Sequence, residues 1–341
     1  MSNLSSRTRG DALPTSARHL RLGVDLGATR IKVVVVEIDA SGEVALRFSA
    51  QYPTAADEGP SAVAERLARY ALDAVAEVGR VVGAGVGIPG LYRASSGEIE
   101  FLPNMPGAWR GFRLREYLTT LWRVPVVLIN DARAFTLAEA RLGAGKGHQT
   151  VVGVTVGTGI GGGLVVDGRL LMGSDGRRGE VGHQIVEVDG PLCTCGGFGC
   201  VEALAGSLAL MRATGLASLD EIYAAAERGE KEARAAVARA AKYLAAGIAN
   251  VVTLLRPERV VIGGGAASAS RLLIASLRDM VARRAALVDA ETYEIVAAEL
   301  GPVAGAIGAA LWSAEIDSGM CMDDVNDIPV SNVTRFGTLK R

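Results

Sequence analysis

Residues 20–38 read LRLGVDLGATRIKVVVVEI, two apolar runs separated by the short polar turn Asp25–Arg30. Runs rich in valine and isoleucine that flank a glycine turn predict two adjacent strands. A second turn, Thr155–Gly159, also lies between two apolar runs, so each turn could open one half of a repeated architecture. A third glycine turn, Gly263–Gly265, follows the apolar run 260–262.

Strand and helix patterns alternate around these turns. Apolar residues at helical spacing predict helices, and short apolar runs bounded by turn residues predict strands. The resulting mixture predicts an α/β protein with mixed sheets. Helices are predicted over 61–78, 114–122, 132–142, 270–284 and 304–314, with a mostly helical region over 204–255, and further strands over 81–88, 124–129, 150–156, 164–166, 260–262 and 294–298.

The chain has 341 residues, enough for two domains that share one cleft. We predict a small α/β domain formed by residues 20–130 and 302–316, and a large α/β domain formed by residues 131–301. Polar residues without periodicity predict a disordered tail over 1–19 and a polar C-terminal tail over 317–341.

The composition, with 49% hydrophobic and 21% charged residues, is typical of a soluble globular protein. A formal net charge of −1 gives no overall field that would attract nucleic acid or an anionic membrane, so neither is expected as a partner. The N-terminus lacks the apolar stretch of a secretory signal, and the most membrane-like stretch, 295–312, contains Glu299 and Pro302. Three of the four cysteines cluster within eight residues, which is unlike a disulfide framework and predicts a cytoplasmic location.

The glycine turns are candidates for phosphate binding, because residues without a Cβ let a phosphate approach several backbone N–H groups. The alternative for each turn is a tight hairpin whose glycines only supply a positive φ. The fingerprints of Rossmann and P-loop proteins are absent from the sequence, so a nucleotide would bind between two hairpin turns. Arg30 could pair with phosphate oxygens and Asp25 could hold Mg²⁺. The candidate nucleotide-binding residues are Asp25, Gly27, Thr29, Arg30, Gly157, Thr158, Gly159, Gly263, Gly264 and Gly265.

Asn130 and Asp131 stand where a predicted strand ends and a predicted helix begins. An aspartate at such a position can simply cap the helix. It can also act as the general base that removes the proton from a hydroxyl as this attacks a γ-phosphate. Both interpretations remain open at the level of the residues.

His183, Cys193, Cys195 and Cys200 have the spacing His-x9-Cys-x-Cys-x4-Cys. Three thiolates and one imidazole form a closed tetrahedral shell for a structural Zn²⁺. Free buried cysteines are the alternative, since a disulfide within Cys-x-Cys closes badly. Glu180 and Glu202 flank these ligands, so a metal would fix two carboxylates that can accept hydrogen bonds from sugar hydroxyls. Otherwise, each glutamate would be a solvated surface charge.

The chain resembles the ROK family (repressors, open reading frames and kinases) and, within it, the bacterial glucokinase-like sugar kinases. The resemblance covers about residues 20–314. It rests on the Asp25–Arg30 turn, Pro103-Asn104, Asn130-Asp131-Ala132, the glycine-rich block 156–183 that ends in GEVGH, and CTCGGFGCVE at 193–202.

This resemblance implies a two-domain actin/hexokinase-like (ribonuclease H-like) fold with an active-site cleft between the domains. It implies ATP with Mg²⁺ as donor, Asp131 as general base, and a homodimer, with a tetramer as the alternative. His183 would bind zinc through one ring nitrogen and a sugar hydroxyl through the other. The sugar contacts implied are Asn104, Asn130, Asp131, Glu180, His183 and Glu202.

Two positions depart from the family pattern. Gly27–Arg30 reads Gly-Ala-Thr-Arg where many family kinases have Gly-Gly-Thr-Lys, although arginine still supplies a positive charge. Arg133 stands where an asparagine is common in the family, and a cation beside the pocket could change which substrate is preferred.

The resulting hypothesis is a kinase that transfers the γ-phosphate of ATP to the primary hydroxyl of a hexose, most simply glucose to glucose 6-phosphate. The alternatives are another hexose, an amino sugar or a sugar-like C7-cyclitol. A third hypothesis is a sugar-responsive regulator, because the family includes repressors with a DNA-binding helix-turn-helix. Only 24 residues precede Asp25 here, without an apolar helix pattern, which favours the kinase.

Overall fold

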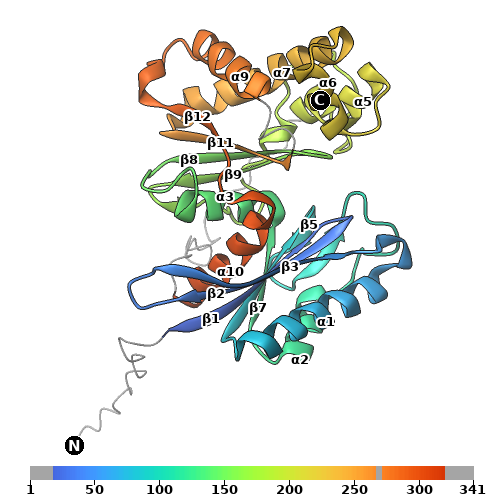
Figure 1. Cartoon of the computed structure of the whole chain (residues 1–341), viewed down its shortest axis with the longest axis vertical. Coiled ribbons are helices and arrows are strands. Elements are labelled where there is room, and N and C mark those ends of the chain that lie inside the picture. Colours follow the sequence, from blue (N-terminus) through green and yellow to red (C-terminus); the bar gives the residue numbers. More distant parts are fainter. Residues whose placement is uncertain (1–17, 266–270, 319–341) are drawn as a thin grey trace, which may run out of the picture.

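The computed structural model describes residues 18–265 and 271–318, and its core is built on two five-stranded sheets (Figure 1). The first sheet has the strand order β3-β2-β1-β4-β7. Its first three strands pair antiparallel, whereas β4 and β7 continue the sheet in parallel with β1. The strands are β1 (His19–Leu26), β2 (Arg30–Ile38), β3 (Val44–Pro53), β4 (Gly83–Ile88) and β7 (Val126–Asn130).

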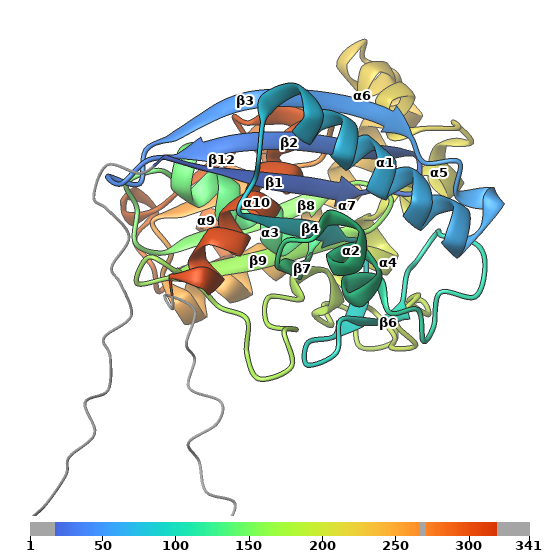
Figure 2. The ribbon, with the colours of Figure 1, turned by 90° about the horizontal axis from the view of Figure 1, so that it is seen from below.

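Helices cover both faces of this sheet, which explains why β2 is apolar at consecutive positions. Val33 and Val35 pack in one core with α1 (Pro60–Val78) and α2 (Leu114–Trp122), which lie on the near face in Figure 2. Val34 and Val36 point to the opposite core, together with residues of α10 (Ala304–Asp317).

The second sheet has the strand order β10-β9-β8-β11-β12. It repeats the pattern of the first sheet, an antiparallel hairpin with a third strand on one side and parallel strands on the other. The duplication suggested by the two glycine turns is therefore present in the topology. The strands are β8 (Val151–Val156), β9 (Ile160–Val166), β10 (Arg169–Leu170), β11 (Arg259–Gly263) and β12 (Glu294–Ala297).

The outer face of the second sheet is covered by helices with a core of alanine, valine, leucine and isoleucine (Figure 1). These helices are α4 (Val201–Ala205), α5 (Ser207–Thr214), α6 (Leu219–Glu227), α7 (Lys231–Leu255) and α9 (Arg271–Arg284). Apart from α3 (Asp131–Leu142), the other elements in the described part of the chain are the hairpin β5 (Leu91–Arg93) and β6 (Glu98–Phe101) and the short 3-10 helices Ala56–Glu58, Val181–His183, Ala290–Thr292 and Gly301–Val303.

Two helices, α10 and α3 (Asp131–Leu142), lie between the sheets and join the two halves of the molecule (Figure 1). They pack closely: a Cβ on Gly308 would lie only 1.7 Å from the carbonyl oxygen of Ala134. Asp131, the candidate general base, is thus the first residue of a helix that packs between the two sheets.

The α/β prediction is confirmed, with differences in detail. Strand β9 begins at Ile160 rather than Leu164, so the glycines before Leu164 belong to the strand and not to a loop. They are glycines because α3 packs closely against them: a Cβ on Gly163 would lie 2.5 Å from the Thr136 hydroxyl. The helical region 204–255 is divided into separate helices, and Gly215 and Gly229 adopt positive φ at two of the breaks. Strand β3 and the β5–β6 hairpin were not predicted from the sequence.

The ends of the ordered chain also differ slightly from the predicted tails. Strand β1 already includes His19, and α10 extends to Asp317, whose carboxylate pairs with Arg21 at 2.5 Å. Arg18 and Ser318 are also described, but the rest of both predicted tails, including Cys321, lies outside the described residues. Ser270, where a helix was predicted to begin, also lies outside them.

One helix in the described part of the chain, α7, is long and apolar enough to cross a membrane by length and composition alone. Within its most apolar window, 61% is buried inside the structure, which a core helix of a globular protein also shows.

Candidate active site and metal site

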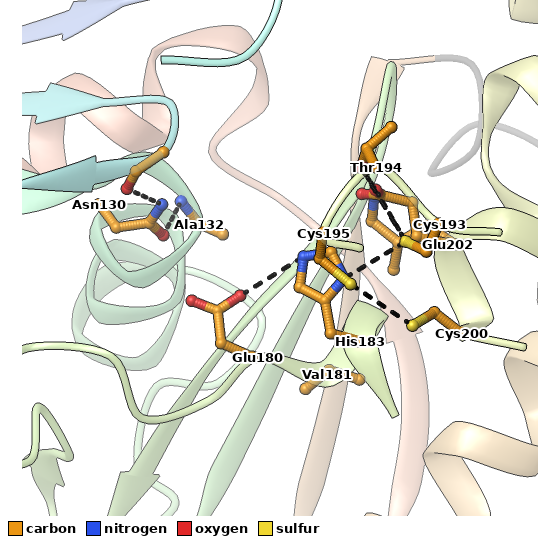
Figure 3. A network of polar contacts seen from close by, with 12 residues as sticks. Asn130, Ala132, Glu180, Val181, His183, Cys193, Thr194, Cys195, Cys200 and Glu202 are labelled. Atoms are coloured by element: carbon orange, nitrogen blue, oxygen red, sulfur yellow. Dashed lines mark hydrogen bonds and ion pairs between the residues drawn. The ribbon is translucent and has the colours of Figure 1, made fainter. Parts of the chain in front are cut away.

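Asp131 is the first residue of α3, directly after the buried strand β7. The preceding residue caps the helix: Asn130 Oδ1 accepts hydrogen bonds from the backbone N–H groups of Ala132 and Arg133 at 3.1 and 3.3 Å. Asn130 Nδ2 donates to the Gly90 carbonyl at 3.4 Å (Figure 3). The capping role considered for Asp131 is thus filled by Asn130. Asp131 Oδ1 accepts from the adjacent Ala132 N–H at 2.8 Å.

Asp25 and Asp131 lie on either side of Gly87 in the neighbouring strand β4. A Cβ on Gly87 would be 3.7 Å from Asp25 Oδ1 and 3.8 Å from the Cα of Asp131. Burial, and then the charge of Asp25, raise the pKa of Asp131 to about 7. A carboxylate with a pKa near neutrality is well suited to accept a proton under physiological conditions.

The buried Asp25 is held by Lys32, which lies directly opposite it in the β1–β2 pair. Lys32 Nζ donates to Asp25 Oδ2 at 2.7 Å. Sequence reasoning proposed Arg30 as the cation of this turn, yet the Arg30 side chain is exposed. Lys32 was missed, although its position opposite Asp25 in the predicted hairpin could have identified it.

The two phosphate-turn candidates have different surroundings. In the first, Gly27 N–H bonds to the Arg30 carbonyl at 3.0 Å, and the Thr54 hydroxyl bonds to the Gly27 carbonyl. In the second, Gly157 N–H bonds to the Gly159 carbonyl at 2.9 Å, and a Cβ on Gly157 would meet no atom within 4 Å. Thr29 and Thr158 are exposed in these turns. The second turn therefore leaves open space beside Gly157, whereas a Cβ on Gly27 would lie 2.9 Å from the Arg30 carbonyl oxygen.

The third glycine turn is largely explained by packing. A Cβ on Gly263 would lie 2.3 Å from the ring of Phe135, and one on Gly264 would lie 2.0 Å from the Val156 carbonyl oxygen. A Cβ on Gly265 would meet no atom of the described residues within 4 Å. Gly264 also adopts φ +96°. The structure thus gives two of these glycines a packing role that the sequence did not reveal.

The four predicted metal ligands come together. One ligand atom from each of His183, Cys193, Cys195 and Cys200 lies within 4.8 Å of the others (Figure 3). His183 Nδ1 is 3.7 Å from Cys193 Sγ, and the sulfurs of Cys195 and Cys200 are also 3.7 Å apart. Burial and the neighbouring thiols raise the pKa of Cys200 to about 12, since several thiolates cannot ionise together without a cation. This donor set fits a structural Zn²⁺.

Glu180 lies on the opposite side of the His183 ring. Glu180 Oε2 is 4.0 Å from His183 Nε2, so one ring nitrogen faces the sulfur cluster and the other faces a carboxylate (Figure 3). Glu180 Oε1 accepts a hydrogen bond from Arg133 Nη2 at 2.8 Å. The side chain of Glu180 remains 39% exposed, whereas that of Arg133 is buried. Arg133, which the sequence placed beside the pocket, therefore contacts a predicted sugar ligand.

Glu202 connects the cysteine loop with the second glycine turn. Its Oε1 accepts from the Thr194 hydroxyl at 2.7 Å, and its Oε2 accepts from the Ile160 N–H at 2.9 Å. The side chain of Asn104, in the loop after β6, has no such bond to another predicted sugar ligand among the described residues. Its backbone has φ 59°, a conformation that asparagine tolerates better than most residues.

The sequence profile described as "ROK family" matches residues 21–316. The chain belongs to the ROK family. It is 35% identical to the glucokinase of Thermotoga maritima over 308 residues, which cover 85% of this chain and 95% of the relative.

Solved ROK structures confirm the actin/hexokinase-like fold. The ROK hexokinase from Thermus thermophilus superimposes with a TM-score of 0.78 at 36% identity, covering 89% of this chain and 100% of the other. The ROK glucokinase from Streptomyces griseus, solved in complex with glucose and AMPPNP, gives a TM-score of 0.72 at 30% identity, covering 87% and 99%.

Proposed function

We propose that this ROK protein is an ATP-dependent hexose kinase that converts glucose to glucose 6-phosphate. The observation that supports this most directly is the position of Asp131, which begins α3 directly after β7 and lies across Gly87 from Asp25. The kinases among the relatives support the same reaction. Another hexose, an amino sugar or a C7-cyclitol remains the alternative substrate.

Each group has a role in this proposal. The turns at Gly27–Arg30 and Gly157–Gly159 would bind the phosphates of ATP, and Asp25, held by Lys32, would bind Mg²⁺ directly or through water. Mg²⁺ would neutralise charge on the phosphates. Asp131 would take the proton from the primary hydroxyl as its oxygen attacks the γ-phosphorus and ADP leaves. Glu180 and His183 would orient the sugar, with Asn104, Asn130 and Glu202 as further candidates.

The cluster of His183 with three cysteines would hold Zn²⁺ as a structural ion that fixes the orientation of the His183 ring. The resemblance to ROK kinases supports a homodimer, and the clustered cysteines support a cytoplasmic location.

The test of this function is a coupled assay of ADP release over hexoses, N-acetylated amino sugars and cyclitols, with MgATP as donor. We expect glucose to give the highest kcat/KM and its 6-deoxy analogue, which lacks the accepting hydroxyl, to give no turnover. A preference for a cyclitol would replace glucose as the substrate. No turnover of any acceptor, in protein that still binds the sugar, would contradict the kinase.

The pH dependence follows from the environment of Asp131. Because the base must be ionised, kcat/KM for MgATP, which reports the enzyme before Mg²⁺ binds, should fall about tenfold per pH unit below an inflection near pH 7. In the protein without MgATP, Asp25→Asn should lower the pKa of Asp131 measured by NMR titration, since the Asp25 charge raises it. An inflection below pH 5 in the wild type would contradict this assignment.

A further inference from the structure

Arg133 is a fully buried cation in the first turn of α3, close to the proposed base. It lies on α3 two residues beyond Asp131, and its side chain is 1% exposed. Its Nε donates to the carbonyl oxygen of Arg178 at 2.7 Å, and its Nη2 donates to Glu180 Oε1 at 2.8 Å. One guanidinium therefore joins the helix of the base to the loop that presents Glu180.

The two partners of this ion pair differ in exposure. A buried cation cannot move away from its partner without losing charge compensation in a place shielded from water. Glu180, in contrast, is 39% exposed and would be free to adopt other rotamers if nothing held it. The planar guanidinium, with donors in fixed directions, restricts the carboxylate more than an ammonium group would.

The two carboxylate oxygens of Glu180 have different neighbours. Oε1 of Glu180 is engaged by Arg133, and Oε2 is 4.0 Å from His183 Nε2. An ionised carboxylate only accepts hydrogen bonds, so Oε2 would select a hydroxyl donor placed between Glu180 and His183. A sugar without a hydroxyl at that position would leave these groups unpaired.

We propose that Arg133 is a positioning residue that sets the sugar specificity of this kinase, by fixing Glu180 so that it accepts one particular hydroxyl group. The inference rests on the proposed kinase function and adds a residue to it. It also gives a physical meaning to an arginine at this position: the cation acts on the substrate through Glu180.

The test compares kcat/KM for glucose with that for its 1-, 2-, 3- and 4-deoxy analogues. Glu180→Gln first identifies the hydroxyl that Glu180 recognises, as the position where discrimination falls most. Arg133→Gln should then lower discrimination at the same position by about ten- to a hundredfold, the effect of losing a hydrogen bond to a charged group. The KM for ATP should change less than about threefold.

Three variants separate this role from a merely structural one. Arg141→Gln is the matched control, because Arg141 lies on the same helix and pairs with Glu315 at 2.7 Å; discrimination should stay as in the wild type. Arg133→Lys keeps the charge and should discriminate better than Arg133→Gln but less well than the wild type. It also serves as the test variant if Arg133→Gln is too unstable to assay. Adding Arg133→Gln to Glu180→Gln should cause no further loss of discrimination.

The outcomes distinguish the inference from the function on which it rests. Wild-type turnover of glucose with unchanged discrimination in Arg133→Gln, or in Arg133→Lys alone if only that variant folds, would overturn the inference and leave the kinase intact. Equal losses at all four deoxy positions would mean that Arg133 supports the fold only, and would also overturn it. A wild type without sugar kinase activity would overturn both.

Discussion

Replacement of Asp131 by asparagine should lower kcat for glucose by about a thousandfold, within the range of a lost general base. Asparagine keeps the shape of the side chain but cannot take the proton from the attacking hydroxyl. The glucose Kd, measured by calorimetry, should change little, because Glu180 and His183 lie on other elements and keep their mutual geometry. The measurement is the pair of kcat and Kd.

The same substitution should not weaken the fold. Asn130 already caps α3, so the helix start does not depend on the Asp131 carboxylate. The pKa of Asp131 in the folded state, about 7, lies above the ordinary aspartate value. Stability therefore falls as pH rises from the unfolded-state value toward 7, and the ionised carboxylate remains unfavourable above it. At pH 8 the Tm of Asp131→Asn should equal or exceed that of the wild type.

A matched control is Asp220→Asn, at the start of α6, an exposed residue outside the proposed site. It should leave kcat unchanged. If Asp131→Asn retained kcat within about tenfold of the wild type, Asp131 would not be the general base. A large loss of glucose affinity with normal kcat would instead make it a sugar ligand alone.

The sequence predicted the elements whose signals are local. The two runs around Asp25–Arg30 are continuous because helices cover both faces of the sheet, and the spacing of the cysteines and His183 corresponds to the observed cluster. Strand β3 is an exception: it was missed although apolar and polar residues alternate over 46–52, the pattern of a strand at the edge of a sheet. The glycines at the start of β9 read as loop, although they make room for α3.

The finer details of the site depend on contacts that are distant in sequence. Arg133 meets Glu180 across 47 residues, whereas Lys32 pairs with Asp25 across only 7, through the register of a hairpin that the sequence predicts. The helix cap formed by Asn130 becomes visible only in the structure. The same holds for the hydrogen bonds of Glu202 with Thr194 and the Ile160 N–H. Side-chain assignments of this kind require the tertiary structure.

Replacement of Cys195 by serine should abolish the proposed zinc binding and, with it, much of the sugar affinity. Cys195 is exposed, so the substitution itself leaves no cavity in the core, and its effect reports on the metal. Without Zn²⁺, His183 loses the ligand that fixes its ring, and its Nε2 no longer has a defined position relative to Glu180. We expect about one zinc per chain in the wild type and substantially less in the variant.

The glucose KM should rise at least about tenfold, with a lower Tm, because binding of a structural metal contributes to folding free energy. Prolonged treatment of the wild type with a chelator should reproduce both effects, and added Zn²⁺ should reverse them. Cys321→Ser, the only remaining cysteine-to-serine change outside the cluster, is the control and should alter neither property. Zinc-free protein with the wild-type Tm and glucose KM would show that the four residues do not form a structural metal site, because a metal that orients His183 cannot be removed without cost to the sugar pocket.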